Sequence, residues 1–284
     1  MYPNGVRELA DGGTWNTLAG QPTDDSEMAL MLARMLADHG TYNPDSALKA
    51  YLFWLDSGPF DCGHTVSAGL RGRPNLLSQA NGALMRISPL GIFGANYDRS
   101  KVSGWARQDA ALTHPHPVCL ETNSLFAAAI AHVVRTGCQA QDLYLQIKSW
   151  AADVNADERI RTAIANAAVA PPADYLHLQG WVLIAFHNAL WQLLHAPSAE
   201  DGIIDTIMRG GDTDTNAAIC GALLGSVHGR EAIPKRWVDV LLGCRPATGL
   251  KNVRHPRPEC FWPVDVLDLA GRLIDRSAHP GGLG

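Results

Sequence analysis

Residues 210–229 read GGDTDTNAAICGALLGSVHG and join an acidic start to a run of small and apolar residues. Two aspartates and two threonines alternate at positions 212–215, directly before that run. The run carries small residues at the i, i+3, i+4, i+7 spacing of one helix face: Ala218, Gly221, Ala222 and Gly225. Small side chains let helices approach closely, so we expect a central helix that begins beside several charged and hydroxyl-bearing side chains.

A second segment has the same order. PTDDSEMAL, residues 22–30, places a threonine and two aspartates before an apolar run. One interpretation is helix capping, by Asp24 with Glu27 as its capping-box partner and by Asp214 in the later segment. A cap needs only one oxygen, however, and neighbouring carboxylates such as Asp24 and Asp25 repel each other unless a cation lies between them. The alternative is therefore a site for Mg²⁺, Mn²⁺ or Ca²⁺, which prefer oxygen ligands.

Helical periodicity runs through the rest of the chain, and clean two-residue alternation is nearly absent. We therefore predict an all-α protein with one domain over residues 1–284 and a frayed tail at 277–284. Besides the segment after Asp25, the expected helices lie within residues 47–58, 119–137, 142–154, 159–169, 174–195, 199–210, 215–229, 234–243 and 262–276. The expected loops are 69–79, 94–105, 113–117 and 248–259.

Composition excludes several classes of function. The chain has 284 residues, 18% of them charged, a formal net charge of -5 and no basic block, which disfavours nucleic-acid binding. No apolar run reaches the roughly 18–20 residues of a membrane span, and the start lacks the pattern of a signal peptide. Six scattered cysteines without a C-x-x-C pair indicate reduced thiols, a cytoplasmic protein and no zinc site. The oligomeric state is left open.

Taken in chain order, these motifs resemble the ADP-ribosylglycohydrolase family, which includes dinitrogenase reductase-activating glycohydrolase. GQPTDDSEMAL and the 210–229 segment resemble its two metal motifs. NGALMRISPLGI, residues 81–92, resembles its substrate loop and following helix, and THPHP, residues 113–117, resembles its histidine-bearing loop. IPKRWVDVLLG, residues 233–243, resembles the helix that follows the second metal motif.

The resemblance implies an orthogonal helical bundle with a central site for two Mg²⁺ or Mn²⁺ ions. The implied metal ligands are Thr23, Asp24, Asp25, Asp212, Asp214 and Thr215. The four aspartates are also the catalytic candidates, with the general base unassigned. Substrate contacts are implied for Asn81, Gly82, His114 and Gly211. From the residues alone, an ordinary turn is the favoured interpretation of Asn81–Gly82, and 113–117 could equally be a rigid surface loop.

The implied reaction is hydrolysis of the C1″ glycosidic bond of ADP-ribosylated side chains, with release of ADP-ribose. Arginine is favoured over serine, and O-acetyl-ADP-ribose is a further family substrate. Ser78, three positions before Asn81, offers no acid for a guanidinium leaving group. The family's G-x-x-x-G-D-x-x-G pattern does not precede TDDS. Either the recorded start is downstream of the true one, or the protein lacks this helix, which would expose apolar surface and remove an acid. Two alternatives therefore stay open: an inactive module that binds ADP-ribose or metal, or acts as an immunity protein, and a helical scaffold without a site.

Overall fold

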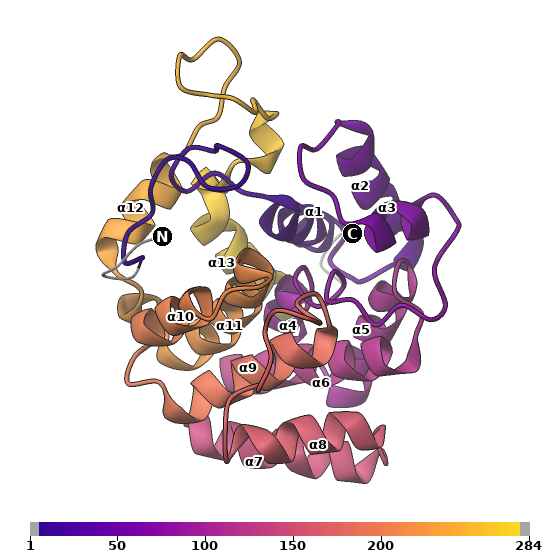
Figure 1. Cartoon of the computed structure of the whole chain (residues 1–284). Helices are drawn as coiled ribbons and strands as arrows, with labels where there is room; N and C mark the ends of the chain where they lie inside the picture. The colour runs from indigo at the N-terminus through magenta and orange to yellow at the C-terminus, as the bar shows by residue number, and fades with distance from the viewer. Residues whose placement is uncertain (1–5, 279–284) are drawn as a thin grey trace.

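The computed structural model describes residues 6–278, and within them the chain forms thirteen α-helices and no β-strand (Figure 1). Ala80 and Trp181 form an isolated antiparallel bridge, as do Gly12 and Thr17. The all-α prediction is confirmed. The helices are α1 (Asp24–His39), α2 (Pro44–Asp56), α3 (His64–Leu70), α4 (Ser88–Phe93), α5 (Arg99–Ala111), α6 (Pro117–Thr136), α7 (Ala140–Asp153), α8 (Glu158–Ala167), α9 (Val182–His195), α10 (Ala199–Met208), α11 (Thr213–His228), α12 (Lys235–Gly243) and α13 (Val266–Ala278).

Helix α6 forms the centre of the core. It packs against α4, α5, α7, α9 and α11. It is also long and apolar enough to cross a membrane by length and composition, so the expectation that no segment reaches that length is wrong. Because 72% of its most apolar stretch is buried inside the protein, α6 is accounted for as a core helix.

Helix α11 contacts α1, α6, α9 and α10, as expected of a central helix. The face that packs is different from the one expected. Ile219, Cys220, Leu223 and Leu224 are buried, whereas the small-residue face is only partly covered. Ala218 on that face lines a cavity, so the small side chains leave space open instead of bringing two helices together.

Several helix boundaries differ from expectation, and α3 lies where the sequence predicted no helix. The loop expected at 94–105 contains the start of α5. The buried face of α5 includes Asp109, and because this residue is charged it interrupts the apolar period by which the sequence would indicate a helix. The helix expected over 174–195 begins only at Val182. Residues 177–180 form a turn before it, and the Ala80–Trp181 bridge follows, in which Asn81 N–H donates to the Gly180 carbonyl and Val182 N–H to the Gln79 carbonyl.

The expected tail falls mostly outside the described residues. Ser277 and Ala278 end α13, and residues 279–284 lie beyond the part of the chain that the structure describes.

Candidate functional site

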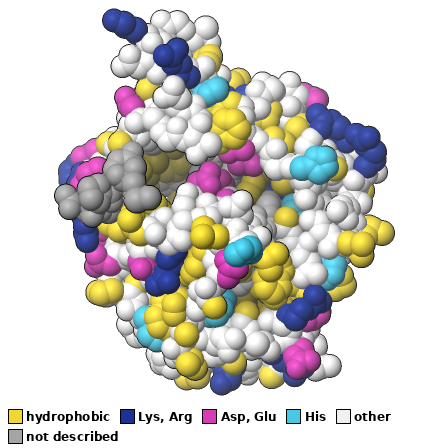
Figure 2. All heavy atoms as spheres, viewed as in Figure 1, with side chains coloured by type: hydrophobic (Ala, Val, Ile, Leu, Met, Phe, Trp, Pro, Cys, Tyr) yellow, Lys and Arg dark blue, Asp and Glu magenta, His cyan; other side chains and the backbone are white. Residues whose placement is uncertain are grey.

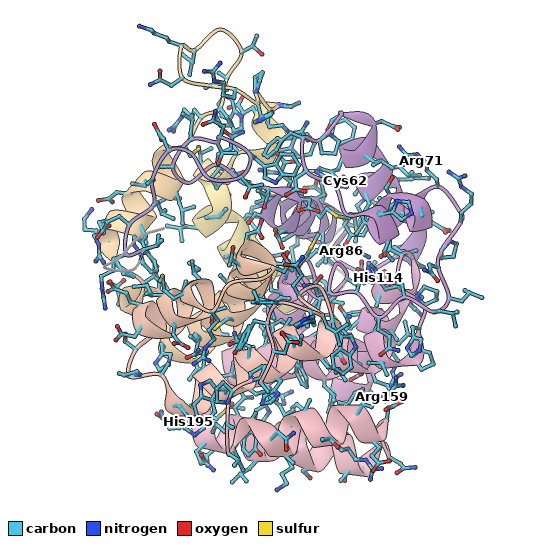
Figure 3. The ribbon with its side chains drawn as sticks, in the orientation of Figure 1. Cys62, Arg71, Arg86, His114, Arg159 and His195 are labelled. Carbon is cyan, nitrogen blue, oxygen red and sulfur yellow. The ribbon has the colours of Figure 1, made fainter. Side chains whose placement is uncertain are left out.

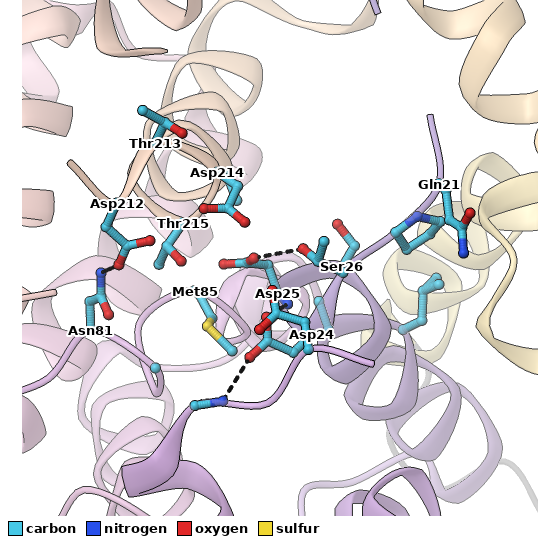
Figure 4. Close-up of a pocket in the computed structure, with 18 of the residues that line it drawn as sticks. Gln21, Asp24, Asp25, Ser26, Asn81, Met85, Asp212, Thr213, Asp214 and Thr215 are labelled. Atoms are coloured by element: carbon cyan, nitrogen blue, oxygen red, sulfur yellow. Dashed lines mark hydrogen bonds between the residues drawn. The ribbon is translucent and has the colours of Figure 1, made fainter. Parts of the chain in front are cut away.

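The two acidic segments, residues 22–30 and 210–229, lie side by side in the structure although they are far apart in the sequence (Figure 4). Asn81, which lies 131 positions before Asp212, is hydrogen-bonded to it. Asp24 and Asp25 open α1, and Asp212 and Asp214 flank the first residue of α11. The capping interpretation of Asp24 and Asp214 is wrong. Thr23 and Asp212 hold the N-cap positions, and neither makes a side-chain cap hydrogen bond. The oxygens of both segments therefore point into a shared space.

Few hydrogen bonds hold the carboxylates of this group. Asp24 accepts from Gly63 N–H at 3.3 Å and from Asp25 N–H at 3.1 Å. Asp25 accepts from the Thr23 hydroxyl at 2.9 Å through Oδ2, while its Oδ1 is buried without a partner among the described residues. Asn81 Nδ2 donates to Asp212 Oδ2 at 2.8 Å. Asp25 thus has an oxygen that the protein itself leaves unsatisfied.

Asp61 joins this group and was not predicted. It stands alone in PFDCG, without a second acid or hydroxyl at metal-ligand spacing, so no sequence signal marked it. Burial and the charge of Asp214 raise the pKa of Asp61, and burial and the charge of Asp61 raise the pKa of Asp24. We refer to Asp24, Asp25, Asp61, Asp212 and Asp214 as the acidic cluster.

The electrostatics of the acidic cluster are uncompensated. Burial, with added repulsion from Asp61 and Asp214, raises the pKa of Asp24 to about 7. Burial also raises the pKa of Asp25, as do the charges of Asp24 and Asp214. Burial raises the pKa of Asp212 as well, against the hydrogen bond from Asn81. Within residues 6–278, no Arg, Lys or His side chain forms an ion pair with any of the five carboxylates.

The donor set fits hard divalent cations. Among the described residues, no group of three or more His, Cys, Asp or Glu side chains is already arranged to hold a metal ion. The available donors are nevertheless carboxylate and hydroxyl oxygens, which Mg²⁺ and Mn²⁺ prefer. The unpartnered Asp25 oxygen and the absence of a protein cation agree with that chemistry. The six predicted ligands, Thr23, Asp24, Asp25, Asp212, Asp214 and Thr215, all line one cavity.

Two glycines keep the backbone of this cavity in place. A Cβ on Gly82 would lie 2.9 Å from Val66 Cγ2 and 3.1 Å from His114 Cε1, so only glycine lets the 81–82 turn sit against these residues. Gly211 has φ 74°, and a Cβ there would lie 1.9 Å from the Tyr175 carbonyl oxygen. His114 is fully buried beneath the turn. The four predicted substrate residues, Asn81, Gly82, His114 and Gly211, therefore line the same cavity as the acidic cluster.

The cavity has a volume of about 1210 Å³ and a mixed lining. The acidic cluster is part of this lining, and Figure 2 shows acidic side chains gathered in a hollow near the middle of this face. Apolar residues of α1, α4 and α13 also line the cavity, among them Leu30, Ile92 and Leu269. Glu8 and Asp11, the acids nearest the start of the described chain, do not join the cluster: Glu8 binds Arg236, and Asp11 accepts from Ala19 N–H.

Comparison with known proteins agrees with this geometry. The family model for ADP-ribosylglycohydrolases matches residues 1–278. The chain belongs to the ADP-ribosylglycohydrolase family. It is 26% identical over 258 residues to an ADP-ribosyl-[dinitrogen reductase] glycohydrolase of Rhodospirillum rubrum, covering 84% of this chain and 79% of that protein. It is 24% identical over 294 residues to an ADP-ribosylarginine hydrolase of Pseudomonas putida, covering 96% of this chain and 71% of that one.

A solved structure has the same fold. An ADP-ribosylglycohydrolase-related protein complex contains a chain that superimposes with a TM-score of 0.77 at 24% identity, over 98% of this chain and 89% of that one. The predicted family and fold are thus confirmed. Membership of the ADP-ribosylglycohydrolases supports an enzyme that hydrolyses ADP-ribose from proteins. The individual roles of the site residues stay predictions.

Proposed function

We propose that this ADP-ribosylglycohydrolase removes ADP-ribose from arginine side chains of proteins and requires two Mg²⁺ or Mn²⁺ ions to do so. The observation that carries metal dependence is the acidic cluster, five carboxylates in one cavity without a cationic partner among the described residues. Arginine is supported by the substrates printed in the names of two relatives, from Rhodospirillum rubrum and Pseudomonas putida.

Thr23, Asp24, Asp25, Asp212, Asp214 and Thr215 would hold the ions, which act as Lewis acids and orient the ribose hydroxyls when bound. In the reaction, water adds to C1″ while the bond from C1″ to the guanidinium nitrogen breaks. A carboxylate of the acidic cluster takes the proton from water, and the leaving nitrogen gains a proton. Asn81 positions the turn that faces the distal ribose, because its amide is held by Asp212.

The test is release of free ADP-ribose from an ADP-ribosyl-arginine protein with Mg²⁺, with Mn²⁺ and with EDTA. ADP-ribosyl-serine protein and O-acetyl-ADP-ribose are run alongside. The enzyme is compared with Asp212→Ala, with Asp61→Asn, and with Asp142→Ala as the matched control, because Asp142 is an exposed acid on α7. Release that needs metal and Asp212, and is greatest with the arginine substrate, supports the proposal. Preference for another substrate would overturn the arginine linkage, and binding of ADP-ribose without release from any substrate would indicate a binding module.

A further inference from the structure

Arg86 is a fully buried cation that the proposed reaction does not use. Its Nε donates to Asp109 Oδ1 at 3.0 Å, and its Nη2 donates to the Asp109 carbonyl at 3.0 Å. Both side chains have 0% exposure. The Tyr51 hydroxyl donates to Asp109 Oδ2 at 2.9 Å, and the Tyr51 ring lies 4.4 Å from the Arg86 guanidinium carbon. The ion pair is therefore saturated and has little freedom to move.

The remaining guanidinium nitrogen links Arg86 to the cavity. Nη1 donates to the Thr113 hydroxyl at 3.0 Å, and the same hydroxyl oxygen lies 2.8 Å from His114 Nδ1. Thr113 and His114 are both fully buried. In the part of the chain that the structure describes, the hydroxyl has no other hydrogen-bond partner. Figure 3 shows Arg86 and His114 near each other in the middle of the molecule.

These contacts decide which way the Thr113 hydroxyl points. Arg86 can only donate, so the Thr113 oxygen accepts from it. If His114 also donated to this oxygen, the hydroxyl proton would be buried without an acceptor, and the Nδ1 proton would face the guanidinium charge. If Thr113 instead donates to Nδ1, every polar group of the chain from Asp109 to Nδ1 is satisfied. A neutral ring with Nδ1 as acceptor carries its proton on Nε2.

The Nε2 edge of His114 faces the substrate turn. Nε2 is buried without a partner among the described residues, and His114 lines the cavity. A Cβ on Gly82 would lie 3.3 Å from Nε2, so glycine is what keeps this edge of the ring clear. Burial and the charge of Arg86 lower the pKa of His114 to about 3, which keeps the ring neutral near pH 7. The ring thus has one N–H, and a ligand oxygen could satisfy it.

We infer that Arg86, acting through Thr113, is a positioning residue that holds His114 with its proton on Nε2, and that this N–H donates to an oxygen of ADP-ribose bound over the Asn81–Gly82 turn. The identity of the ligand rests on the proposed function. The place of the proton does not.

The place of the proton can be measured without any ligand. A long-range ¹H–¹⁵N correlation spectrum of protein labelled at histidine distinguishes a protonated ring nitrogen from a bare one, and His114→Gln identifies the signals of residue 114. We expect a protonated Nε2 and a bare Nδ1 in the wild-type protein. The reverse assignment would overturn the inference, whatever the enzyme proves to hydrolyse.

The ligand contact is tested by calorimetry with ADP-ribose and Mg²⁺. His114→Leu should weaken binding about tenfold or more, as loss of a hydrogen bond to a charged or strongly polar oxygen does. The side-chain amide nitrogen of Gln occupies nearly the position of Nε2, so His114→Gln should stay within about threefold of wild type. Equal affinities of the wild type and His114→Leu would overturn the ligand contact.

The role of Thr113 is tested by a double-mutant cycle. Thr113→Val should weaken binding about tenfold, and Thr113→Ser, which keeps the hydroxyl, should restore it. Thr122→Val is the matched control, because Thr122 is a buried threonine of α6 whose hydroxyl has no partner among the described residues. In the His114→Leu background, Thr113→Val should have no further effect, whereas additive losses would overturn the positioning role. If the wild type fails to bind ADP-ribose, both the proposed function and the ligand contact are overturned, while the spectrum still decides the place of the proton.

Discussion

Buried carboxylates of this molecule fall into two groups that are treated in opposite ways: Asp109 and Glu27, and the Asp24–Asp25 pair of the acidic cluster. Asp109 and Glu27 each face a buried arginine: Asp109 binds Arg86, and Glu27 accepts from Nε and Nη2 of Arg257 at 2.8 Å each. The acidic cluster has no such partner among residues 6–278. Where a carboxylate holds the fold together, the chain supplies the cation. Where it does not, the protein keeps a charge that only an external cation would balance.

The largest effect should come from breaking a paired carboxylate. Asp109→Asn leaves Arg86 buried without a counterion, and we expect a loss of about 3–5 kcal/mol in the free energy of unfolding. Asp25→Asn, in EDTA, should cause no loss, because burial and the charges of Asp24 and Asp214 already disfavour a charged carboxylate at this position. Urea denaturation of both variants, beside the exposed-site control Asp142→Asn, measures the contrast. A comparable loss in Asp25→Asn would contradict the comparison.

The next largest effect should come from a divalent cation bound at the acidic cluster, which should stabilise the folded protein. At a free Mg²⁺ concentration a hundredfold above its Kd, binding to the native state alone should raise the free energy of unfolding by about 2.7 kcal/mol. Asp25→Asn and Asp212→Asn should lose this gain, whereas Asp142→Asn should keep it. Thermal or urea unfolding over a series of Mg²⁺ concentrations measures it, and an unchanged midpoint in the wild type would argue against a metal site.

A smaller effect should appear in the pH dependence of the free energy of unfolding. His114 lies beside the Arg86 pair, and its pKa is lowered from 6.5 to about 3 in the folded protein. The unfolded chain therefore binds a proton below pH 6.5 that the native protein does not, so stability falls as the pH decreases from 6.5 towards 3. The slope from this one group is about 1.4 kcal/mol per pH unit. Urea denaturation in EDTA at pH 6.5 and 5.5 should show the wild type losing about 1 kcal/mol more than His114→Gln, because the unfolded chain is only half protonated at pH 6.5. Parallel losses would place the proton on His114 already in the native state.

The smallest effect concerns Ser57, an uncharged hydrogen-bond partner of the Arg257 that pairs with Glu27. The Ser57 hydroxyl accepts from Arg257 Nη2 at 2.8 Å. Ser57→Ala removes this acceptor while Glu27 continues to balance the charge, so we expect a loss of about 1 kcal/mol in the free energy of unfolding. Ser149→Ala, at an exposed position of α7, is the matched control and should cause no loss. A loss as large as that of Asp109→Asn would show that the carboxylate alone does not stabilise Arg257.

The acidic motifs and most helices could be predicted from the sequence, but the buried pair of Asp109 and Arg86 could not. Adjacent aspartates with neighbouring threonines are conspicuous, because repulsion makes them rare without a reason. Asp109 and Arg86 are single charges in helical or turn segments, and single charges are normally solvated, so nothing marked their burial. Asp61 was missed for the same reason. The late start of α9 depends on hydrogen bonds from Asn81 and Val182 to residues about a hundred positions away, which local periodicity does not report.

The separation of the two acidic segments has a consequence for how the protein reaches its native state. Asp212 meets Asn81 across 131 positions, and α1 lies further away in sequence. Closing so long a loop is entropically unfavourable and is repaid only once much of the core has assembled. Ions that bind where these segments meet would therefore act on the finished fold and not on its early stages. Bound ions would therefore slow unfolding, and the folded protein would last longest where such cations are plentiful.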